Sequence, residues 1–323
     1  GKIASFLFNK LNFSIQSIYK INVIALSIVI VLLTLLFSII FSKQLAIVFF
    51  ISITFSPWVI SFAKNLYWIE FSWFLPAIFS WLLVIQKSKL ERALLYVAIF
   101  LSCLFKCLSG YEYFSSILLF AIAPFSFYCL MSNNLRKSLY YLSIGFKICL
   151  IGSCGFILAI IMHADLRSGG VLSEGFNSIY NDVLHRTFGK NHETSLYIES
   201  LAMNSSIFDV LNSYISHWKT EVIRFPLIKD LSFSTLLIIS ILCIFLEIYR
   251  HDKEEARLNI SLLISFALPA ISWFILAKNH SFIHTHMNFV LWYMGFIAVM
   301  LYIIFKEFVI AIQCEKKIYI KTI

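Results

Sequence analysis

Three histidines lie within the short polar stretch KNHSFIHTHMN, Lys278–Asn288. His280 and His284 are four positions apart, so a helix would place both on one face, whereas His286 would lie on another face. Imidazoles can hydrogen-bond a hydroxyl or a phosphate, and they also bind zinc. Because no carboxylate occurs in the stretch, we expect these histidines to line the mouth of a pocket rather than to hold a metal. Purely structural histidines of a loop are the alternative.

A second group of chemical side chains occurs in the stretch KCLSGYEYF, which contains Lys106, Tyr111 and Glu112. Lys106 ends one apolar run and Glu112 precedes the next. An ammonium group at a membrane surface can pair with a lipid phosphate. The alternative interpretations are a lysine that only anchors a helix end and an acid favoured by a helix N-terminus.

A third group lies in the stretch AKNLYWIE, which contains Lys64 and Glu70. Its tryptophan and tyrosine are typical of a membrane interface. Glu70 is expected one turn inside an apolar helix, where an ionisable side chain is costly and usually has a partner. We therefore expect Lys64 and Glu70 to belong to the rim of a binding site.

Further polar candidates occur in a long hydrophilic segment, namely Asp165, Arg167, His185 and Arg186. The guanidinium fork of arginine suits phosphate recognition. The alternative is that these side chains are simply hydrated. Together with the three groups above, they would bind substrate around Glu112, His284 and His286 as the catalytic residues.

The elements that position these residues follow from composition. The 323 residues are 60% hydrophobic and only 13% charged, whereas soluble domains are about 45–50% apolar and about 25% charged. This composition predicts an all-α, polytopic integral membrane protein. The formal charge of +9 is explained by basic loops of a membrane protein, so nucleic acid is not an expected partner.

Nine apolar runs predict about nine transmembrane helices. They are Val23–Phe41, Leu45–Phe62, Tyr67–Ile85, Ala93–Leu108, Phe114–Leu130, Leu139–Met162, Phe233–Ile248, Leu258–Leu276 and Phe289–Phe305. The chain therefore divides into N-terminal spans with an amphipathic start (1–162), a loop with amphipathic helices (163–232), and C-terminal spans with a basic tail (233–323).

Orientation follows from the short basic loops QKSKLER, NNLRKS and YRHDKEEAR and from the C-terminal lysines. They alternate onto one side of the membrane, which the positive-inside rule assigns to the cytoplasm. The polar groups described above then face the opposite, extracytoplasmic side. Since the first run would start outside without a preceding span, we expect the sequence to be a fragment that lacks an upstream span and its external loop.

Several of these stretches resemble the GT-C class of membrane glycosyltransferases. The similarity rests on FSPWV in the second run, WFLPAI after the next external turn, and FKCLSGYEYFSSILLFAIAP, which is similar to a family stretch with a lysine at the external end of a span. The resemblance implies that Lys106 contacts the phosphate of a polyprenyl-phosphate sugar donor. It also implies a main catalytic acid in the first external loop, within the expected missing region.

The resemblance implies inverting transfer of a sugar from that donor to a glycan, lipid or protein of the cell envelope. A carboxylate would take the acceptor proton, and Lys106, together with Arg186, would stabilise the leaving phosphate. The expected location is a bacterial plasma membrane, with the site facing outward and membrane lipid around it. No cofactor is expected, although a divalent metal stays open.

Two other function classes remain. An O-antigen ligase or polymerase also combines many spans with one long external loop that carries arginine and histidine. A transporter of lipids or small molecules would show internal repeats, broken helices and charges at the membrane midplane. No repeat is visible in the sequence.

Overall fold

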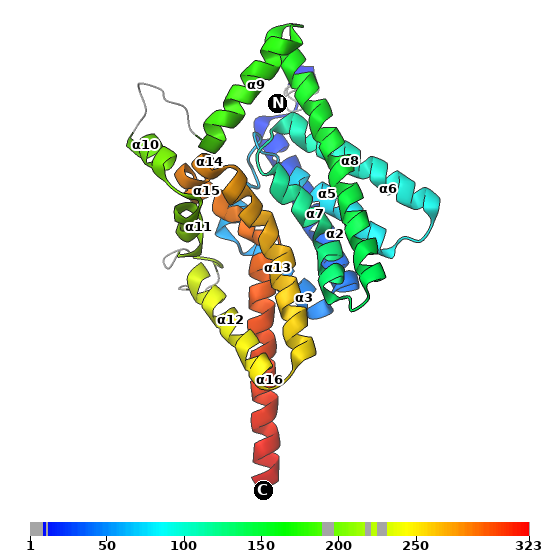
Figure 1. Ribbon diagram of the computed structural model, residues 1–323, viewed down its shortest axis with the longest axis vertical. Helices are drawn as coiled ribbons and strands as arrows, with labels where there is room; N and C mark the ends of the chain where they lie inside the picture. Colours follow the sequence, from blue (N-terminus) through cyan, green and yellow to red (C-terminus); the bar gives the residue numbers. More distant parts are fainter. Residues whose placement is uncertain (1–8, 11, 189–196, 217–220, 225–230, 323) are drawn as a thin grey trace.

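The computed structural model describes residues 9–10, 12–188, 197–216, 221–224 and 231–322, and it omits the side chains of 185–188, 197–200 and 314–322. Helices account for most of these residues, and the one extended pairing in the described part is an isolated bridge between Glu221 and Ser232. Figure 1 shows a bundle of long helices with α9 at one end and α16 projecting from the other.

In the described part of the chain, six helices are long and apolar enough to cross a membrane: α2 (Ile15–Ile40), α6 (Lys89–Ser109), α7 (Phe114–Met131), α8 (Leu135–Ser168), α13 (Lys253–Leu276) and, over Phe296–Gln313, α16. Three apolar helices are shorter: α3 (Lys43–Thr54), α5 (Phe71–Ile85) and α12 (Phe233–Tyr249). The predicted all-α membrane class is confirmed. The number of nine spans stays a prediction.

Hydroxyl and amide side chains start four of these apolar helices. Ser14, Ser42 and Ser232 each accept a hydrogen bond from a backbone N–H three residues later, at the beginning of α2, α3 and α12. Asn134 does the same for α8. Such caps satisfy amide groups that have no partner within the helix, and they fix where each apolar run starts.

The second apolar run, Leu45–Phe62, does not form one helix. It is split into α3 and the short α4 (Pro57–Phe62). Ser56 caps α4, Pro57 occupies its first turn, and the carbonyl of Phe55 accepts a hydrogen bond of 2.9 Å from the backbone N–H of Arg224. The proline ends one helix and begins another, because it has no N–H to donate and its φ suits a helix start.

The last apolar run, Phe289–Phe305, is also broken. A 3₁₀ helix, η1 (Phe289–Tyr293), is followed by Gly295 with φ +90° and then by α16 (Phe296–Thr322). A Cβ at Gly295 would lie 2.2 Å from Cδ1 of Phe266. Both the left-handed backbone and this close approach require glycine. The segment expected as a basic tail is therefore a continuation of α16.

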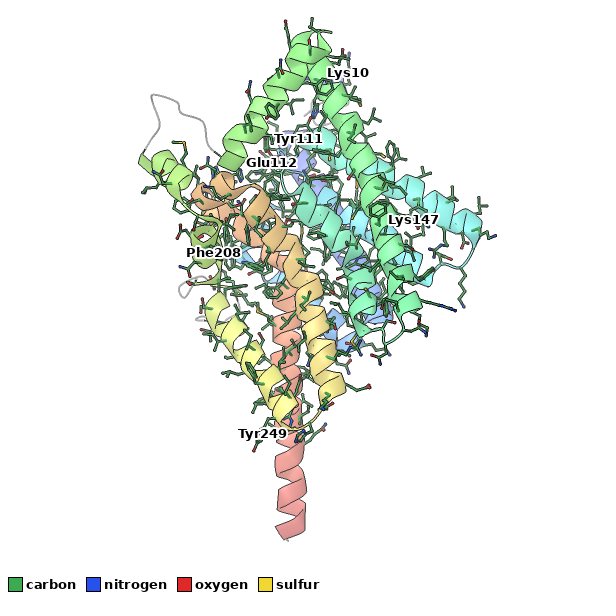
Figure 2. The ribbon with its side chains drawn as sticks, in the orientation of Figure 1. Lys10, Tyr111, Glu112, Lys147, Phe208 and Tyr249 are labelled. Atoms are coloured by element: carbon green, nitrogen blue, oxygen red, sulfur yellow. The ribbon has the colours of Figure 1, made fainter. Side chains whose placement is uncertain are left out.

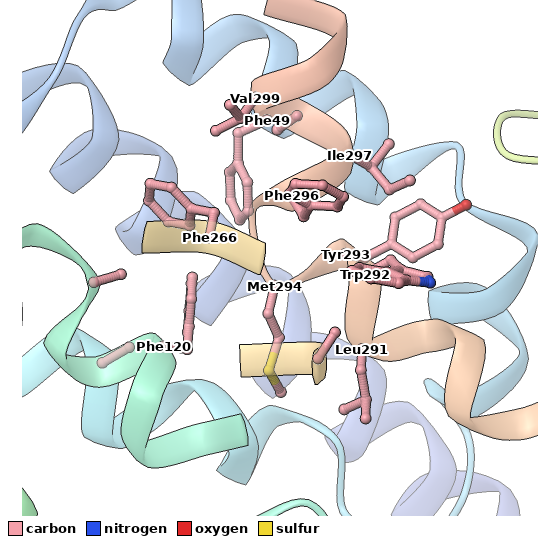
Figure 3. Close-up of a cluster of buried hydrophobic side chains, with 14 of the residues drawn as sticks. Phe49, Phe120, Phe266, Leu291, Trp292, Tyr293, Met294, Phe296, Ile297 and Val299 are labelled. Carbon is pink, nitrogen blue, oxygen red and sulfur yellow. The ribbon is translucent and has the colours of Figure 1, made fainter. Parts of the chain in front are cut away.

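Aromatic side chains join α3, in the first broken run, to the rest of the bundle, and Figure 3 shows Phe49 and Phe266 among the buried side chains. Phe37 stacks on Phe49 with ring centroids 4.3 Å apart and lies 5.5 Å from Phe266, which connects α2, α3 and α13. Trp81 of α5 packs 4.8 Å from Phe37. All four side chains are fully buried, so this cluster is the rigid centre on which both ends of the molecule are built.

Charged turns gather at one end of the bundle. Arg257 donates to the backbone carbonyls of Leu130 and Ser132, and Arg250 pairs with Glu307 at 2.6 Å. These contacts join the α7–α8 and α12–α13 turns and α16. Figure 2 places Tyr249 at this end, and Tyr111, Glu112 and Lys10 toward the other. The two ends are thus chemically distinct, and the compartment that each one faces stays a prediction.

The long hydrophilic segment begins later than expected. The sequence predicts its start at residue 163, but α8 continues to Ser168, and Gly169 with φ +63° turns the chain into the next helix. The amphipathic helices are α9 (Leu172–Phe188), α10 (Tyr197–Asn204) and α11 (Ile207–Ile215). They pack against α14 (Lys278–Ile283), which carries His280.

Candidate functional site

Tyr113 lies at the centre of a buried polar cluster between the helices. Its side chain is fully buried, and its hydroxyl donates a hydrogen bond of 2.7 Å to Oδ1 of Asn288 in α15 (Thr285–Asn288). Its ring packs edge-on against Trp73 of α5 at 4.9 Å and Trp273 of α13 at 5.3 Å. Tyr113 therefore connects the α6–α7 turn to three other parts of the bundle.

Glu70 is a buried acid beside this tyrosine. It lies just before α5, is only 2% exposed, and neither carboxylate oxygen has a hydrogen-bond partner among the described residues. Burial raises the pKa of Glu70 well above its ordinary value, because the low-dielectric surroundings disfavour the charged form. Glu70 also acts electrostatically on Tyr113. A carboxyl group of this kind is available to accept a proton or a hydrogen bond from a ligand.

The backbone next to the buried acids is strained. Ile69, which precedes Glu70, has φ +45°, and Tyr113, which follows Glu112, has φ +65°. Positive φ is uncommon for non-glycine residues and is an outlier for a β-branched one. Strain of this kind is concentrated at functional sites, where surrounding structure holds it in place.

Lys106 and Glu112 face one another across the α6–α7 turn. Lys106 is 1% exposed and its Nζ donates a hydrogen bond of 2.7 Å to the carbonyl of Gly110. Glu112 is 4% exposed, and its carboxylate acts electrostatically on the Lys106 ammonium. A Cβ at Gly110 would lie 2.4 Å from a carboxylate oxygen of Glu112. Glycine at position 110 therefore leaves space for the Glu112 carboxylate near Lys106.

Two of the three histidines reach the cluster. His280 approaches Asn288 at 3.4 Å between Nδ1 and Nδ2, and its ring lies 4.6 Å from that of His284. His286 is exposed, with its ring 5.6 Å from that of His284. The helix ends at Ile283, so the three imidazoles follow a turn rather than one helical face. The described residues contain no group of three or more His, Cys, Asp or Glu that could hold a metal.

Tyr111 contacts a different partner. Its hydroxyl forms a hydrogen bond with Nδ1 of His163 near the end of α8. Burial raises the pKa of Tyr111 to about 12, against the smaller opposite effect of Arg167. Arg167 itself pairs with Asp182 at 2.7 Å and donates to Ser178 at 3.1 Å. These residues fix the corner between α8 and α9 beside the candidate site.

The remaining predicted residues lie elsewhere. Asp165 is exposed near the end of α8, and Lys64 is exposed on the turn after α4. His185 and Arg186 fall in the last turn of α9, and their side chains lie outside the described part. The structure therefore brings Lys106, Glu112, Glu70, His280 and His284 to one end around Tyr113, and it does not bring Asp165 or Lys64 into that cluster.

Comparisons with protein-family models, curated proteins and solved structures found no match to this chain. Function must therefore be argued from this cluster. Its buried ammonium group, two buried carboxyl groups and paired imidazoles can bind a phosphate, accept a proton and orient a hydroxyl group.

Sequence reasoning missed three residues that hold the cluster together. Tyr113 and Asn288 form its central hydrogen bond. Tyr214 of α11 stacks on Phe274 with ring centroids 3.7 Å apart and donates to the carbonyl of Ser281 at 2.7 Å, which fixes α14. Tyr113 and Asn288 belong to stretches that we had singled out. Their uncharged side chains gave no signal of a role, because tyrosine and asparagine are ordinary at membrane surfaces.

Proposed function

We propose that this chain is a membrane glycosyltransferase of the GT-C kind that takes a sugar from a polyprenyl phosphate and transfers it to a glycan, lipid or protein of the cell envelope. The observation that carries the proposal is the convergence of Lys106, Glu112 and Glu70 with His280 and His284 around Tyr113, from three separate segments of the chain. The proposed place is the extracytoplasmic end of a bundle in the bacterial plasma membrane.

Lys106 is the proposed group that meets the donor phosphate. Its ammonium donates to the carbonyl of Gly110, and a phosphate oxygen can replace that neutral acceptor with a charged one. The neighbouring Glu112 carboxylate favours the charged form of Lys106. Charge that develops on the leaving phosphate would then be stabilised in a buried setting, where the interaction is stronger than in water.

Glu70 is the proposed base for the acceptor hydroxyl, and Glu112 becomes the group that positions Lys106. A general base works best when its pKa lies near the working pH, and burial raises the pKa of Glu70 toward that range. His280 and His284 would orient the acceptor, because their rings adjoin the Asn288–Tyr113 hydrogen bond.

The test is sugar transfer by the purified protein in liposomes that contain a panel of radiolabelled polyprenyl-phosphate hexoses and pentoses. We expect Lys106→Ala to lower kcat about 100- to 1,000-fold, as loss of one group that stabilises transition-state charge does. Glu70→Gln should abolish the rise of kcat with pH, whereas Glu112→Gln should mainly raise KM for the donor. Lys137→Gln, a change of an exposed lysine at the opposite end, is the matched control. Full activity of Lys106→Ala, or no transfer from any donor, would refute the proposal.

Transport is the second candidate function, because two adjacent apolar segments are broken. The break between α3 and α4 lies beside η1, where Trp58 packs 4.8 Å from Phe289. Broken helices of this kind form substrate sites in many transporters. A flux of polyprenyl-phosphate sugar across liposomes, without sugar transfer to an acceptor, would favour this second function.

A further inference from the structure

A groove lies on the outer surface of α2, outside the Tyr113 cluster. Its volume is about 430 Å³, and it is lined by Gln16, Tyr19, Lys20, Val23, Ile24 and Lys64. This size falls within the roughly 300–1,000 Å³ of ligand-binding clefts. The residues come from the first turns of α2 and from the turn after α4, so the groove is built by two segments.

The groove has a charged rim and an aliphatic floor. Lys20 and Lys64 are exposed, and neither forms an ion pair within the described part of the chain. Val23 and Ile24 follow one turn deeper along α2, where its apolar run begins. Two cations above aliphatic side chains complement an amphiphile with a negative head and a hydrocarbon tail.

The turn that carries Lys64 is held in place by hydrogen bonds. Nδ2 of the buried Asn22 donates to the carbonyl of Asn65 at 3.0 Å, which ties the turn to α2. Oδ1 of Asn65 accepts from the backbone N–H groups of Tyr67 and Trp68. The distance between the two lysine-bearing segments is therefore set before any ligand arrives, and less ordering is needed on binding.

We infer that this α2 groove binds an anionic phospholipid of the surrounding bilayer, with the phosphate between Lys20 and Lys64 and an acyl chain along Val23 and Ile24. A bilayer lipid fits better than the sugar donor, because the groove is open on the exposed face of α2. The donor phosphate must instead reach Lys106, which is 1% exposed. The inference is independent of the proposed sugar transfer.

The test is native mass spectrometry of the full chain in detergent, with phosphatidylglycerol or zwitterionic phosphatidylcholine added. We expect phosphatidylglycerol to bind more tightly, and Lys20→Gln/Lys64→Gln to weaken its binding roughly 30-fold, since each basic residue near an anionic surface contributes about fivefold. Val23→Phe should weaken binding as well, because it fills the floor without changing charge. Lys137→Gln, which removes an exposed charge outside the groove, should bind as the wild type does.

Thermal unfolding of each variant separates lost binding from lost folding, and the exposed lysines should leave the melting temperature unchanged. Equal binding of the two phospholipids would overturn the inference. So would a loss of phosphatidylglycerol binding with Lys137→Gln as large as that with Lys20→Gln/Lys64→Gln. Displacement of phosphatidylglycerol by polyprenyl phosphate at equal concentration, dependent on Lys20 and Lys64, would also overturn it and assign the groove to the donor. Displacement by inorganic phosphate alone would show a headgroup site without a lipid tail, against our inference.

Discussion

At the scale of single residues, Glu70 dominates the chemistry because it is buried without a hydrogen-bond partner in the described structure. Its pKa in the folded protein is raised by burial. At a pH above the ordinary pKa of glutamate, the unfolded chain releases the carboxyl proton of Glu70, whereas the folded chain keeps it. The contribution of Glu70 to stability is therefore complete at low pH and is lost as pH rises toward the raised pKa.

Glu70→Gln should flatten this pH dependence. Within that window we expect the wild type to lose up to about 1.4 kcal/mol of unfolding free energy per pH unit relative to the variant. Urea or thermal unfolding in detergent at several pH values measures the difference. Glu254→Gln changes an exposed acid of α13, and its unfolding free energy should depend on pH as that of the wild type does. If the unfolding free energies of Glu70→Gln and the wild type depended on pH in the same way, Glu70 would be ionised in the folded protein.

Gly295 is the second residue whose type is dictated by the backbone. We expect Gly295→Ala to cost about 1–3 kcal/mol for the left-handed conformation, in addition to the clash with Phe266, which a Cβ would meet at 2.2 Å. Thermal unfolding should show a clear drop in melting temperature. Phe266→Leu should cost less stability in the Gly295→Ala chain than in the wild-type chain, because only there does it also relieve the clash. Equal costs in the two chains would mean that the backbone conformation alone requires glycine.

At the scale of elements, the sequence predicted where apolar helices lie but not where they break. The mean hydropathy predicts Leu45–Phe62 as one apolar run, because Ser56 and Pro57 hardly change the average over the segment. The break follows from Ser56 and Pro57, and a distant partner, the N–H of Arg224, donates a hydrogen bond to the Phe55 carbonyl there. Glu70, Lys106 and Glu112 were recognisable as costly charges in apolar surroundings. That these three side chains lie together around Tyr113 could not be predicted from the sequence, because it depends on how α5, α7 and α13 pack.

Two buried polar side chains join α12 to α13. Glu247 and Asn259 are fully buried, and Nδ2 of Asn259 donates to Oε1 of Glu247 at 2.6 Å. Oε2 of Glu247 and Oδ1 of Asn259 have no hydrogen-bond partner among the described residues. An unsatisfied buried polar atom is destabilising. The pair therefore limits how well these two helices can pack.

Glu247→Gln should keep or increase stability, because its amide offers both an acceptor for Nδ2 and a donor for Oδ1 of Asn259. Asn259→Leu should lower the unfolding free energy by about 1–3 kcal/mol, since it leaves the whole Glu247 carboxyl group without a partner. Circular dichroism during heating in detergent distinguishes the two variants. A loss of stability with Glu247→Gln as large as that with Asn259→Leu would show that the carboxylate charge itself is needed.

At the scale of the whole molecule, the fold separates two kinds of polar chemistry. One end carries basic residues in the first turns of helices that follow short loops, including the exposed Lys137 of α8 and the half-buried Arg257 of α13, and ion pairs such as Lys306 with Glu255. The other end carries Glu70, Glu112, Lys106 and the histidines, covered by the helices of the long segment. Exposed lysine and arginine on short turns favour the cytoplasmic side. The Tyr113 end would then face outward, where a lipid-linked sugar donor is proposed to bind.

This sidedness predicts a labelling pattern. In intact cells, a membrane-impermeant maleimide should modify His286→Cys, because His286 is exposed at the Tyr113 end. It should not modify Lys137→Cys until the membrane is permeabilised, because Lys137 lies on the turn at the opposite end. The wild type, whose own cysteines include the exposed Cys154, gives the background. Modification of both variants from outside would remove the physical basis of the proposed site, since Lys106, which is proposed to bind phosphate, and the turns that are predicted to be cytoplasmic could not then be on opposite sides of one bilayer.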